Sequence, residues 1–209
     1  MKLLELFSGT GSVGKMAKLF KIEVTSWDRD MPADIQTDIM DWDYKAALEP
    51  GTFDIIWASP PCTEYSRAKT IGVRDIEGSN KVVQRTLDII NYFQPKWWII
   101  ENPQSGLLKQ QVMMQDLPYK DIDYCKYGMP YRKRTRLWNN IEIWTPRPMC
   151  KRDCDSMDET RKRHKESAQR GATRQNKANK HRQSELYVVP SSLITEILAK
   201  VVTSHLTTD

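Results

Sequence analysis

Short apolar runs alternate with segments of helical periodicity along the first two thirds of the chain. Runs rich in β-branched and aromatic residues indicate buried strands, and the clearest are residues 2–7, 23–27, 53–58 and 97–100. Residues 80–93 carry apolar side chains at helical spacing and precede Pro95, which predicts a helix that ends before the proline. Strands that alternate with helices are typical of an α/β fold with a mostly parallel sheet flanked by helices.

Weaker patterns complete the expected elements: helices ending near Phe20 and spanning 41–48, and strands at 34–39, 121–127 and 136–143. The polar residues 63–79 predict a long loop, of the kind that forms lids and binding loops. Residues 191–202 place apolar side chains on one helical face, so this helix should pack back on the domain. We therefore divide the chain into residues 1–143, 144–186 and 187–209.

Composition bounds the class of protein. The chain has 209 residues, of which 39% are hydrophobic and 28% charged, and this balance indicates a soluble globular protein. No apolar run approaches the roughly 18 residues of a membrane span, and the N-terminus enters a strand without a signal peptide. We expect a monomer without membrane contact, in the cytoplasm or in the nucleus of a eukaryotic host.

Positive charge is concentrated in one part of the chain. The net charge is +5, and residues 151–182 alone hold 11 Lys or Arg against 5 Asp or Glu. A basic segment on a near-neutral body indicates a polyanionic partner. The alternative is a solvated or disordered arm, and the two are compatible because such arms often become ordered on nucleic acid.

A glycine-rich turn follows the first predicted strand. Gly9, Gly11 and Gly14 give the spacing GxGxxG, which lets a ligand approach the backbone and also occurs in NAD-binding proteins. Asp28 ends the second predicted strand, where a carboxylate can accept hydrogen bonds from ribose hydroxyls, although a turn or capping aspartate is an equal alternative. Asp38 ends the third predicted strand.

Two chemically reactive side chains follow the next two predicted strands. Ser59, Pro60 and Pro61 stop a strand because neither proline can donate a ladder hydrogen bond, and Cys62 follows at once. Its thiol would lie at the carboxyl edge of a parallel sheet, where ligands gather; a small buried cysteine in a tight turn is the alternative. Glu101 ends the following apolar strand, and burying it there is costly without a partner or a task.

In this order the motifs resemble those of the cytosine-C5 DNA methyltransferases. Residues 6–11 (LFSGTG) resemble the cofactor motif of that family, residues 59–62 (SPPC) its nucleophile motif, and residues 101–102 (EN) its glutamate motif, here followed by Pro103 where valine is common. The dense basic turn at residues 128–136 resembles its arginine motif. A dehydrogenase needs neither the cysteine nor the glutamate, and DNA amino-methylating enzymes have an aromatic residue where this chain has Cys62.

The resemblance implies a Rossmann-like S-adenosylmethionine-dependent methyltransferase fold over residues 1–143, with a small basic recognition segment at 144–186. Cys62 would add to C6 of a flipped cytosine, Glu101 would hydrogen-bond N3, and Arg134 and Arg136 would hold O2 and the phosphate. The residues expected to bind S-adenosylmethionine are Phe7, Ser8, Gly9, Thr10, Gly11, Asp28, Arg29, Asp38, Ile39 and Pro60. Those expected to contact DNA are Ser66, Arg67, Arg132, Lys133, Arg161, Lys162 and Arg163.

The short recognition segment departs from full-length members of this family. A compact form is similar to viral or phage-type enzymes, and such a small element predicts short or relaxed sequence specificity. The same mechanism on RNA or on a free nucleotide is a second hypothesis, and an altered one-carbon donor stays open. A non-catalytic nucleic-acid-binding or regulatory subunit is a third, although a pure binder would need neither Cys62 nor Glu101.

The remaining cysteines have the spacing of a metal site. Four cysteines in a chain of this size do not make a disulfide framework. Cys150, Cys154 and His164 have zinc-like spacing, and Cys125 or His181 would supply a fourth ligand to a structural zinc. The alternative is free thiols on a polar excursion of the chain.

Overall fold

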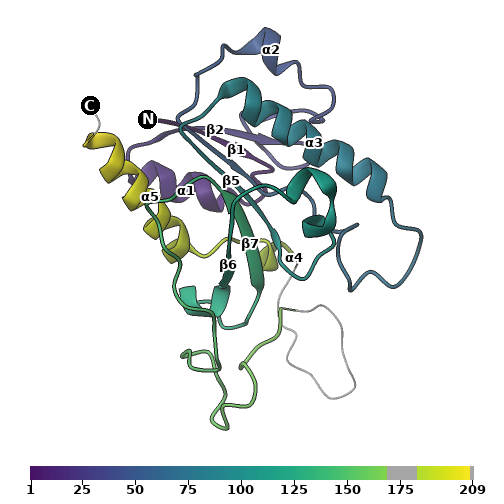
Figure 1. Ribbon diagram of the computed structural model, residues 1–209, viewed down its shortest axis with the longest axis vertical. Coiled ribbons are helices and arrows are strands. Elements are labelled where there is room, and N and C mark those ends of the chain that lie inside the picture. The colour runs from purple at the N-terminus through teal and green to yellow at the C-terminus, as the bar shows by residue number, and fades with distance from the viewer. Residues whose placement is uncertain (169–182, 208–209) are drawn as a thin grey trace.

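A seven-stranded sheet forms the centre of the computed structural model, which describes residues 1–168 and 183–207 (Figure 1). Its strand order is β3-β2-β1-β4-β5-β7-β6, and only β7 runs antiparallel to its neighbours. The predicted α/β fold with a mostly parallel sheet is therefore confirmed. The strands are β1 (Lys2–Leu6), β2 (Glu23–Asp28), β3 (Ile35–Gln36), β4 (Ile55–Ala58), β5 (Trp97–Pro103), β6 (Tyr119–Asp123) and β7 (Arg134–Asn139).

Helices cover both faces of this sheet (Figure 1). They are α1 (Ser12–Leu19), α2 (Tyr44–Ala47), α3 (Ile76–Phe93), α4 (Gln183–Leu186) and α5 (Ser191–Leu206), with 3-10 turns η1 (Leu108–Gln110), η2 (Val112–Met114) and η3 (Tyr124–Tyr127). Side chains alternate along each strand, so Ile55 and Trp57 of β4 pack toward α1 and α5 whereas Ile56 packs toward α3. Two apolar cores, one on each face, hold the strand ends in fixed register.

Several predicted boundaries were wrong because local hydrogen bonds overrode the apolar pattern. The strand expected at 121–127 ends at Asp123, and η3 follows it and closes at Gly128, whose φ is 89°. The strand expected at 136–143 begins at 134 and ends at Asn139. The Asp75 carboxylate accepts from the Gly78 N–H at 2.8 Å, so α3 begins at Ile76, inside the segment predicted as a loop.

The two short elements between β2 and β4 are also smaller than expected. The strand predicted at 34–39 is the two-residue β3, and the helix predicted at 41–48 is the single turn α2. The Asp43 carboxylate accepts from the Ala46 N–H at 3.2 Å and therefore fixes the start of α2 three residues late. Neither difference moves Asp28 or Asp38 from the carboxyl edge of the sheet.

Residues 144–168 are the first described part of the recognition segment predicted at 144–186, and they contain turns and no helix or strand of more than one bridge. Isolated bridges join Met157 to His164 and Tyr131 to Glu166. Beyond it, α5 packs beside α1 (Figure 1) and buries Leu193, Ile197 and Val201. The division into three parts stays a prediction. Among the described residues, no helix has the length and apolar character needed to cross a membrane.

Candidate active site

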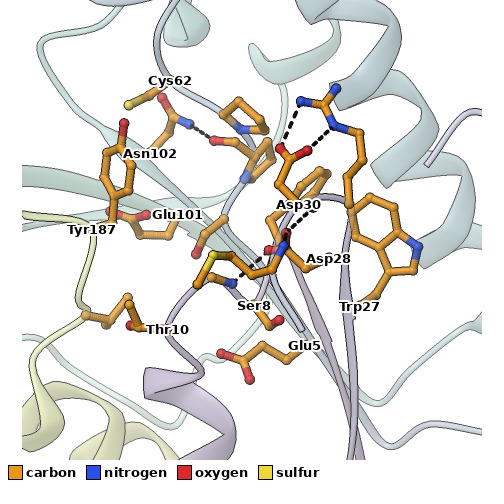
Figure 2. Close-up of a pocket in the computed structure, with 18 of the residues that line it drawn as sticks. Glu5, Ser8, Thr10, Trp27, Asp28, Asp30, Cys62, Glu101, Asn102 and Tyr187 are labelled. Atoms are coloured by element: carbon orange, nitrogen blue, oxygen red, sulfur yellow. Dashed lines mark hydrogen bonds and ion pairs between the residues drawn. The ribbon is translucent and has the colours of Figure 1, made fainter. Parts of the chain in front are cut away.

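A pocket of about 310 Å³ lies at the carboxyl ends of β1, β2, β4 and β5. Figure 2 shows two groups of side chains facing it, with Asp28 and Asp30 on one side and Cys62, Glu101 and Asn102 on the other. This edge of an open α/β sheet is where ligands bind. We call the first side the donor end and the second side the nucleophile end.

The backbone of the glycine-rich turn lines the donor end. The backbone curls here with positive φ at Phe7 (59°), Gly9 (51°) and Gly11 (68°). Glycine adopts this conformation easily, whereas it is strained for a residue with a side chain such as Phe7. The Ser8 N–H donates to the carbonyl of Trp27 at 3.0 Å, and the Gly9 N–H donates to Asp28 Oδ2 at 2.8 Å. The turn is therefore fastened to the end of β2.

Glu5 lies buried beneath the first turn of α1. Its carboxylate accepts from the N–H groups of Val13 at 3.2 Å and Gly14 at 2.9 Å, which would otherwise be unpaired at a helix start. Burial raises the pKa of Glu5 to about 7, although both hydrogen bonds oppose the shift. A Cβ on Gly14 would stand 2.6 Å from Glu5 Oε2, so the last glycine of the motif permits helix–strand packing.

Asp28 organises the rest of the donor end. Its Oδ1 accepts from the N–H groups of Asp30 and Met31, both at 2.9 Å, so the carboxylate already holds two segments of backbone. Arg29 pairs with Asp30 at 2.9 Å and with Asp38 at 3.6 Å on the open rim. Nine of the ten residues expected at the cofactor site line this pocket, and the tenth, Gly11, lies next to the lining residues Thr10 and Ser12.

Asp30 also lines the pocket, although the sequence analysis did not single it out. The signal was available, because Asp30 lies two residues beyond the end of β2 in an acidic turn. Its carboxylate is exposed and paired with Arg29, which keeps the pKa of Asp30 below its usual value. A second carboxylate at this edge increases the capacity of the donor end for hydroxyl groups.

Cys62 faces the nucleophile end directly after the Pro-Pro pair (Figure 2). Burial raises the pKa of its thiol; the nearby Lys133 ammonium opposes this shift and the Glu101 carboxylate adds to it. The thiol is therefore protonated at neutral pH, and reactivity requires a positive charge or a base close by. Lys133 is placed to supply that charge.

Glu101 is buried at the end of β5, with an exposed fraction of 6%. Its Oε1 accepts from the Tyr124 hydroxyl at 2.9 Å and lies 3.5 Å from Lys133 Nζ. The same ammonium donates to the carbonyl of Leu186 at 3.1 Å. Lys133, which directly precedes β7, therefore joins the glutamate to the last residue of α4, and η3 also positions the glutamate through Tyr124.

Asn102 holds the loop that carries Cys62. Its Nδ2 donates to the carbonyl of Pro60 at 2.9 Å, which ties the Pro-Pro turn to the end of β5. Its Oδ1 is buried in the pocket wall and accepts no hydrogen bond from any described residue. A buried acceptor without a partner is costly, so this oxygen is suited to a ligand N–H or O–H.

The structure does not bring Arg134 and Arg136 into the pocket, contrary to the expectation for the basic turn. Arg134 forms a bidentate pair with Asp123, both bonds at 3.0 Å, and Arg136 pairs with Asp121 at 2.7 and 2.9 Å. The acidic residues of the edge strand β6 lie directly opposite these arginines and accept their hydrogen bonds. Lys133 lies in the pocket instead, and contact between the arginines and cytosine stays a prediction.

The other residues expected to contact DNA lie outside the pocket lining. Ser66 and Arg67 follow Cys62 in a loop that Arg74 organises by donating to the carbonyls of Glu64, Ser66 and Lys69. Four more are exposed on the basic turn and the recognition segment: Arg132, Arg161, Lys162 and Arg163. Their contact with DNA stays a prediction.

Two pocket residues come from the end of the chain. Tyr187 and Val189 line the cavity, and the Val189 N–H lies 3.4 Å from Ser12 Oγ of α1. The sequence analysis missed both residues. No local pattern identifies them, because their role depends on a contact between positions 177 residues apart.

The predicted metal ligands also come together. The ligand atoms of Cys125, Cys150, Cys154 and His164 all lie within 4.8 Å of one another. The sequence left the fourth ligand open between Cys125 and His181. Cys125 joins the group, and His181 lies outside the described residues. This group is separate from the pocket.

Comparisons with known proteins agree with the motifs. A family model described as C-5 cytosine-specific DNA methylase matches residues 1–124. The chain is 34% identical over 220 residues to the "Probable DNA (cytosine-5)-methyltransferase" of Frog virus 3 (isolate Goorha), with 95% of this chain and 99% of that protein covered. A solved structure of an Escherichia coli prophage protein described as a "putative DNA modification methyltransferase" has a TM-score of 0.52 at 16% identity. That match covers 72% of this chain and about half, 52%, of the prophage protein, and it supports the fold alone.

Proposed function

This chain belongs to the C-5 cytosine-specific DNA methylases, and we propose that it transfers a methyl group from S-adenosylmethionine to C5 of a flipped cytosine through a covalent adduct of Cys62. The observation that carries this proposal is that one pocket holds a glycine-rich donor end together with Cys62 and Glu101. The compact length of the chain matches that of its viral relative.

The donor end fits S-adenosylmethionine. Asp28 and Asp30 present carboxylates where ribose hydroxyls can donate, and the curled backbone at Gly9 leaves room for a ligand. The pocket volume of about 310 Å³ lies at the lower bound of small-molecule sites. When bound there, the cofactor supplies an electrophilic methyl group on sulfonium sulfur.

Cys62 overcomes the low nucleophilicity of cytosine C5. Its thiolate forms a bond to C6, and the electron pair of the C5–C6 double bond becomes available at C5 for the methyl group. Glu101 hydrogen-bonds N3 and so stabilises the electron-rich ring. The C5 proton then passes to solvent water, the C5–C6 double bond re-forms as the sulfur–C6 bond breaks, and Cys62 leaves as the thiolate.

Lys133 assists this chemistry electrostatically. Its ammonium lies 3.5 Å from Glu101 and lowers the pKa of Cys62, which burial alone would raise further. Asn102 keeps the Cys62 loop against β5 through its bond to Pro60. Reaction at a base carbon requires the cytosine to leave the duplex stack, so the pocket must admit an extruded nucleotide.

The test combines tritium-labelled S-adenosylmethionine with a mixed-sequence DNA duplex. Wild-type protein should label cytosine C5, and Cys62→Ser should label nothing while it still binds the methyl donor. Sequencing the methylated product gives the recognised site. Parallel reactions with RNA and with free cytidine nucleotides distinguish the substrate.

A second assay traps the adduct. DNA with 5-fluorocytosine at the methylated site should remain covalently attached to wild-type protein, because C5 then carries fluorine and has no proton to lose. Cys62→Ser should form no covalent adduct with this DNA. Absence of both methyl transfer and trapping, with DNA binding intact, would contradict the proposal and favour a nucleic-acid-binding subunit.

A further inference from the structure

Three thiols and one imidazole converge at the junction of η3 and the recognition segment. Cys150 Sγ lies 3.6 Å from His164 Nε2, and all four ligand atoms lie within 4.8 Å of one another. A tetrahedral zinc ion, with bonds of about 2.3 Å to sulfur and 2.0–2.1 Å to nitrogen, separates its ligand atoms by about 3.5–3.8 Å. Small side-chain adjustments would therefore complete such a site.

The donor set determines which ion fits. Three sulfurs and one imidazole nitrogen favour zinc over the oxygen-seeking magnesium and calcium ions. Four protein ligands leave no open position for water, which is the arrangement of structural and not catalytic zinc. All three cysteines are free and at least nine-tenths buried, so no disulfide accounts for their clustering.

Apart from polar contacts such as Ser156 Oγ to the Met129 carbonyl at 2.6 Å and Lys126 to Asp153 at 3.0 Å, the recognition segment has only a small core. Its local apolar cluster consists of the three cysteines and Met157. Arg152 has a φ of 68° in the turn between Cys150 and Cys154, and a bridge between Met157 and His164 returns the chain to the cluster. A segment with so small a core commonly requires a metal or another crosslink to fold.

The cluster is connected to the active site through three consecutive residues. Asp123 is buried and accepts from the Cys150 N–H at 3.0 Å as well as from Arg134. Tyr124 follows and donates to Glu101, and Cys125 comes next and belongs to the cluster. The position of the Tyr124 hydroxyl therefore depends on the same short turn that carries one of the thiols.

We propose that Cys125, Cys150, Cys154 and His164 bind one structural zinc ion that fastens the recognition segment to the sheet and fixes the turn that positions Tyr124 against Glu101. β6 runs in the same direction as β5, so the ion lies at the edge of the sheet that also carries the pocket. Tyr124 is a positioning residue in this arrangement.

Metal content tests the site directly. Full-length protein purified from zinc-containing medium should carry one zinc per chain by elemental analysis, and Cys154→Ser should carry at least ten times less. Cys62→Ser is the matched control, because it removes the remaining cysteine and should keep the full complement. Metal-free wild-type protein, a disulfide among the three cysteines, or full zinc in Cys154→Ser would overturn the proposal.

Cobalt gives a second readout that does not depend on a folded variant. Wild-type protein reconstituted with Co²⁺ should show the visible absorption of tetrahedral thiolate-bound cobalt, and zinc should displace it. His164→Cys retains four ligands and should shift this spectrum without abolishing it. A wild-type spectrum of octahedral, water-bound cobalt would contradict the geometry.

The link to Glu101 rests on the proposed methyl transfer and is tested separately. Cys154→Ser should lower kcat by at most about fivefold, the loss expected when the Tyr124–Glu101 hydrogen bond is deleted, and leave the dissociation constant of S-adenosylmethionine unchanged. Unchanged kcat in a zinc-free variant would refute the link and leave the metal site standing. Failure of methyl transfer in wild-type protein would count against the proposed function and not against zinc.

Discussion

The two ends of the pocket are built in different ways. The donor end comes from residues 5–38, which are close in sequence and joined by backbone hydrogen bonds to Glu5 and Asp28. The nucleophile end gathers Cys62, Glu101 and Lys133 from separate elements, and side chains connect them. The donor end can therefore form from one continuous stretch of the chain, whereas the nucleophile end forms only after elements distant in sequence have packed together.

This difference separates binding from chemistry. Substitutions at the donor end should change affinity for the methyl donor or the stability of the first βαβ unit. Substitutions at the nucleophile end should change the rate of transfer and leave donor affinity nearly constant. Four substitutions test this separation.

The largest effect is expected at the nucleophile end. Glu101→Gln keeps an oxygen for the Tyr124 hydroxyl but cannot give a proton to N3, so kcat should fall about 10³-fold, within the range for lost acid catalysis. Donor affinity measured by calorimetry should change less than about twofold. A similarly large loss of donor affinity would contradict the separation of donor binding at one end from chemistry at the other.

Next in size is a pH effect beneath the donor end. Because burial raises the pKa of Glu5 from 4.5 to about 7, its contribution to stability is complete below about pH 4.5 and is lost as the pH rises through 7. The loss amounts to about 3 kcal/mol. Glu5→Gln cannot ionise, so its free energy of unfolding in urea should change between pH 5 and pH 8 by roughly 2–3 kcal/mol less than that of wild type.

The matched control for this experiment is Glu23→Gln, which replaces an exposed glutamate of β2. It should retain the pH dependence of wild-type stability. Equal pH dependence in Glu5→Gln and wild type would show that Glu5 ionises freely in the folded protein.

A smaller effect is expected from Asp28→Ala. It removes a carboxylate that accepts from Gly9, Asp30 and Met31, and a hydrogen bond to a charged group contributes about 1.5–3 kcal/mol. The dissociation constant of S-adenosylmethionine should rise about 10–100-fold, with kcat at saturating donor nearly unchanged. Asp34→Ala is the control, because Asp34 accepts from Ser26 outside the pocket lining and should leave donor affinity intact.

The smallest effect is expected from Tyr124→Phe, which deletes one hydrogen bond to Glu101. A loss of about 1 kcal/mol corresponds to about a fivefold decrease in kcat. Tyr92→Phe, on α3, removes a comparable bond to the Leu48 carbonyl at the end of α2 and should have no effect on the rate. Equal rates for Tyr124→Phe and wild type would remove Tyr124 from the positioning of Glu101.

The sequence predicted what local patterns encode. Apolar runs followed by Gly9, Pro60 or Glu101 identified the strand ends and therefore the edge at which the pocket lies. The predicted ends of β6 and β7 were wrong because η3, which closes at Gly128, begins directly after Asp123 of β6. The Asn139 side chain, which accepts from the Ile141 N–H, ends β7. Such caps are weak signals beside the apolar pattern.

Side-chain partners across the sheet were harder to predict. Spacing alone placed Arg134 and Arg136 on one face, but it did not reveal that Asp123 and Asp121 lie opposite them on β6. Likewise, spacing alone did not reveal that Cys125 joins Cys150, Cys154 and His164, because this depends on where η3 meets the recognition segment. The arginine–aspartate pairs depend on the register of β6 against β7, and the cysteine–histidine group depends on where the chain folds back against η3. A single sequence specifies neither.

The wall that Tyr187 and Val189 add to the pocket bears on the timing of synthesis. At 5–20 residues per second, a ribosome completes Glu101 roughly 4–17 s before it reaches Tyr187. During that interval the nascent chain holds its thiol and glutamate but lacks the Leu186 carbonyl that Lys133 contacts and the helix that covers α1. Cys62 and Glu101 are therefore synthesised early, but the pocket around them is complete only after Tyr187 and Val189 have been added near the end of this sequence.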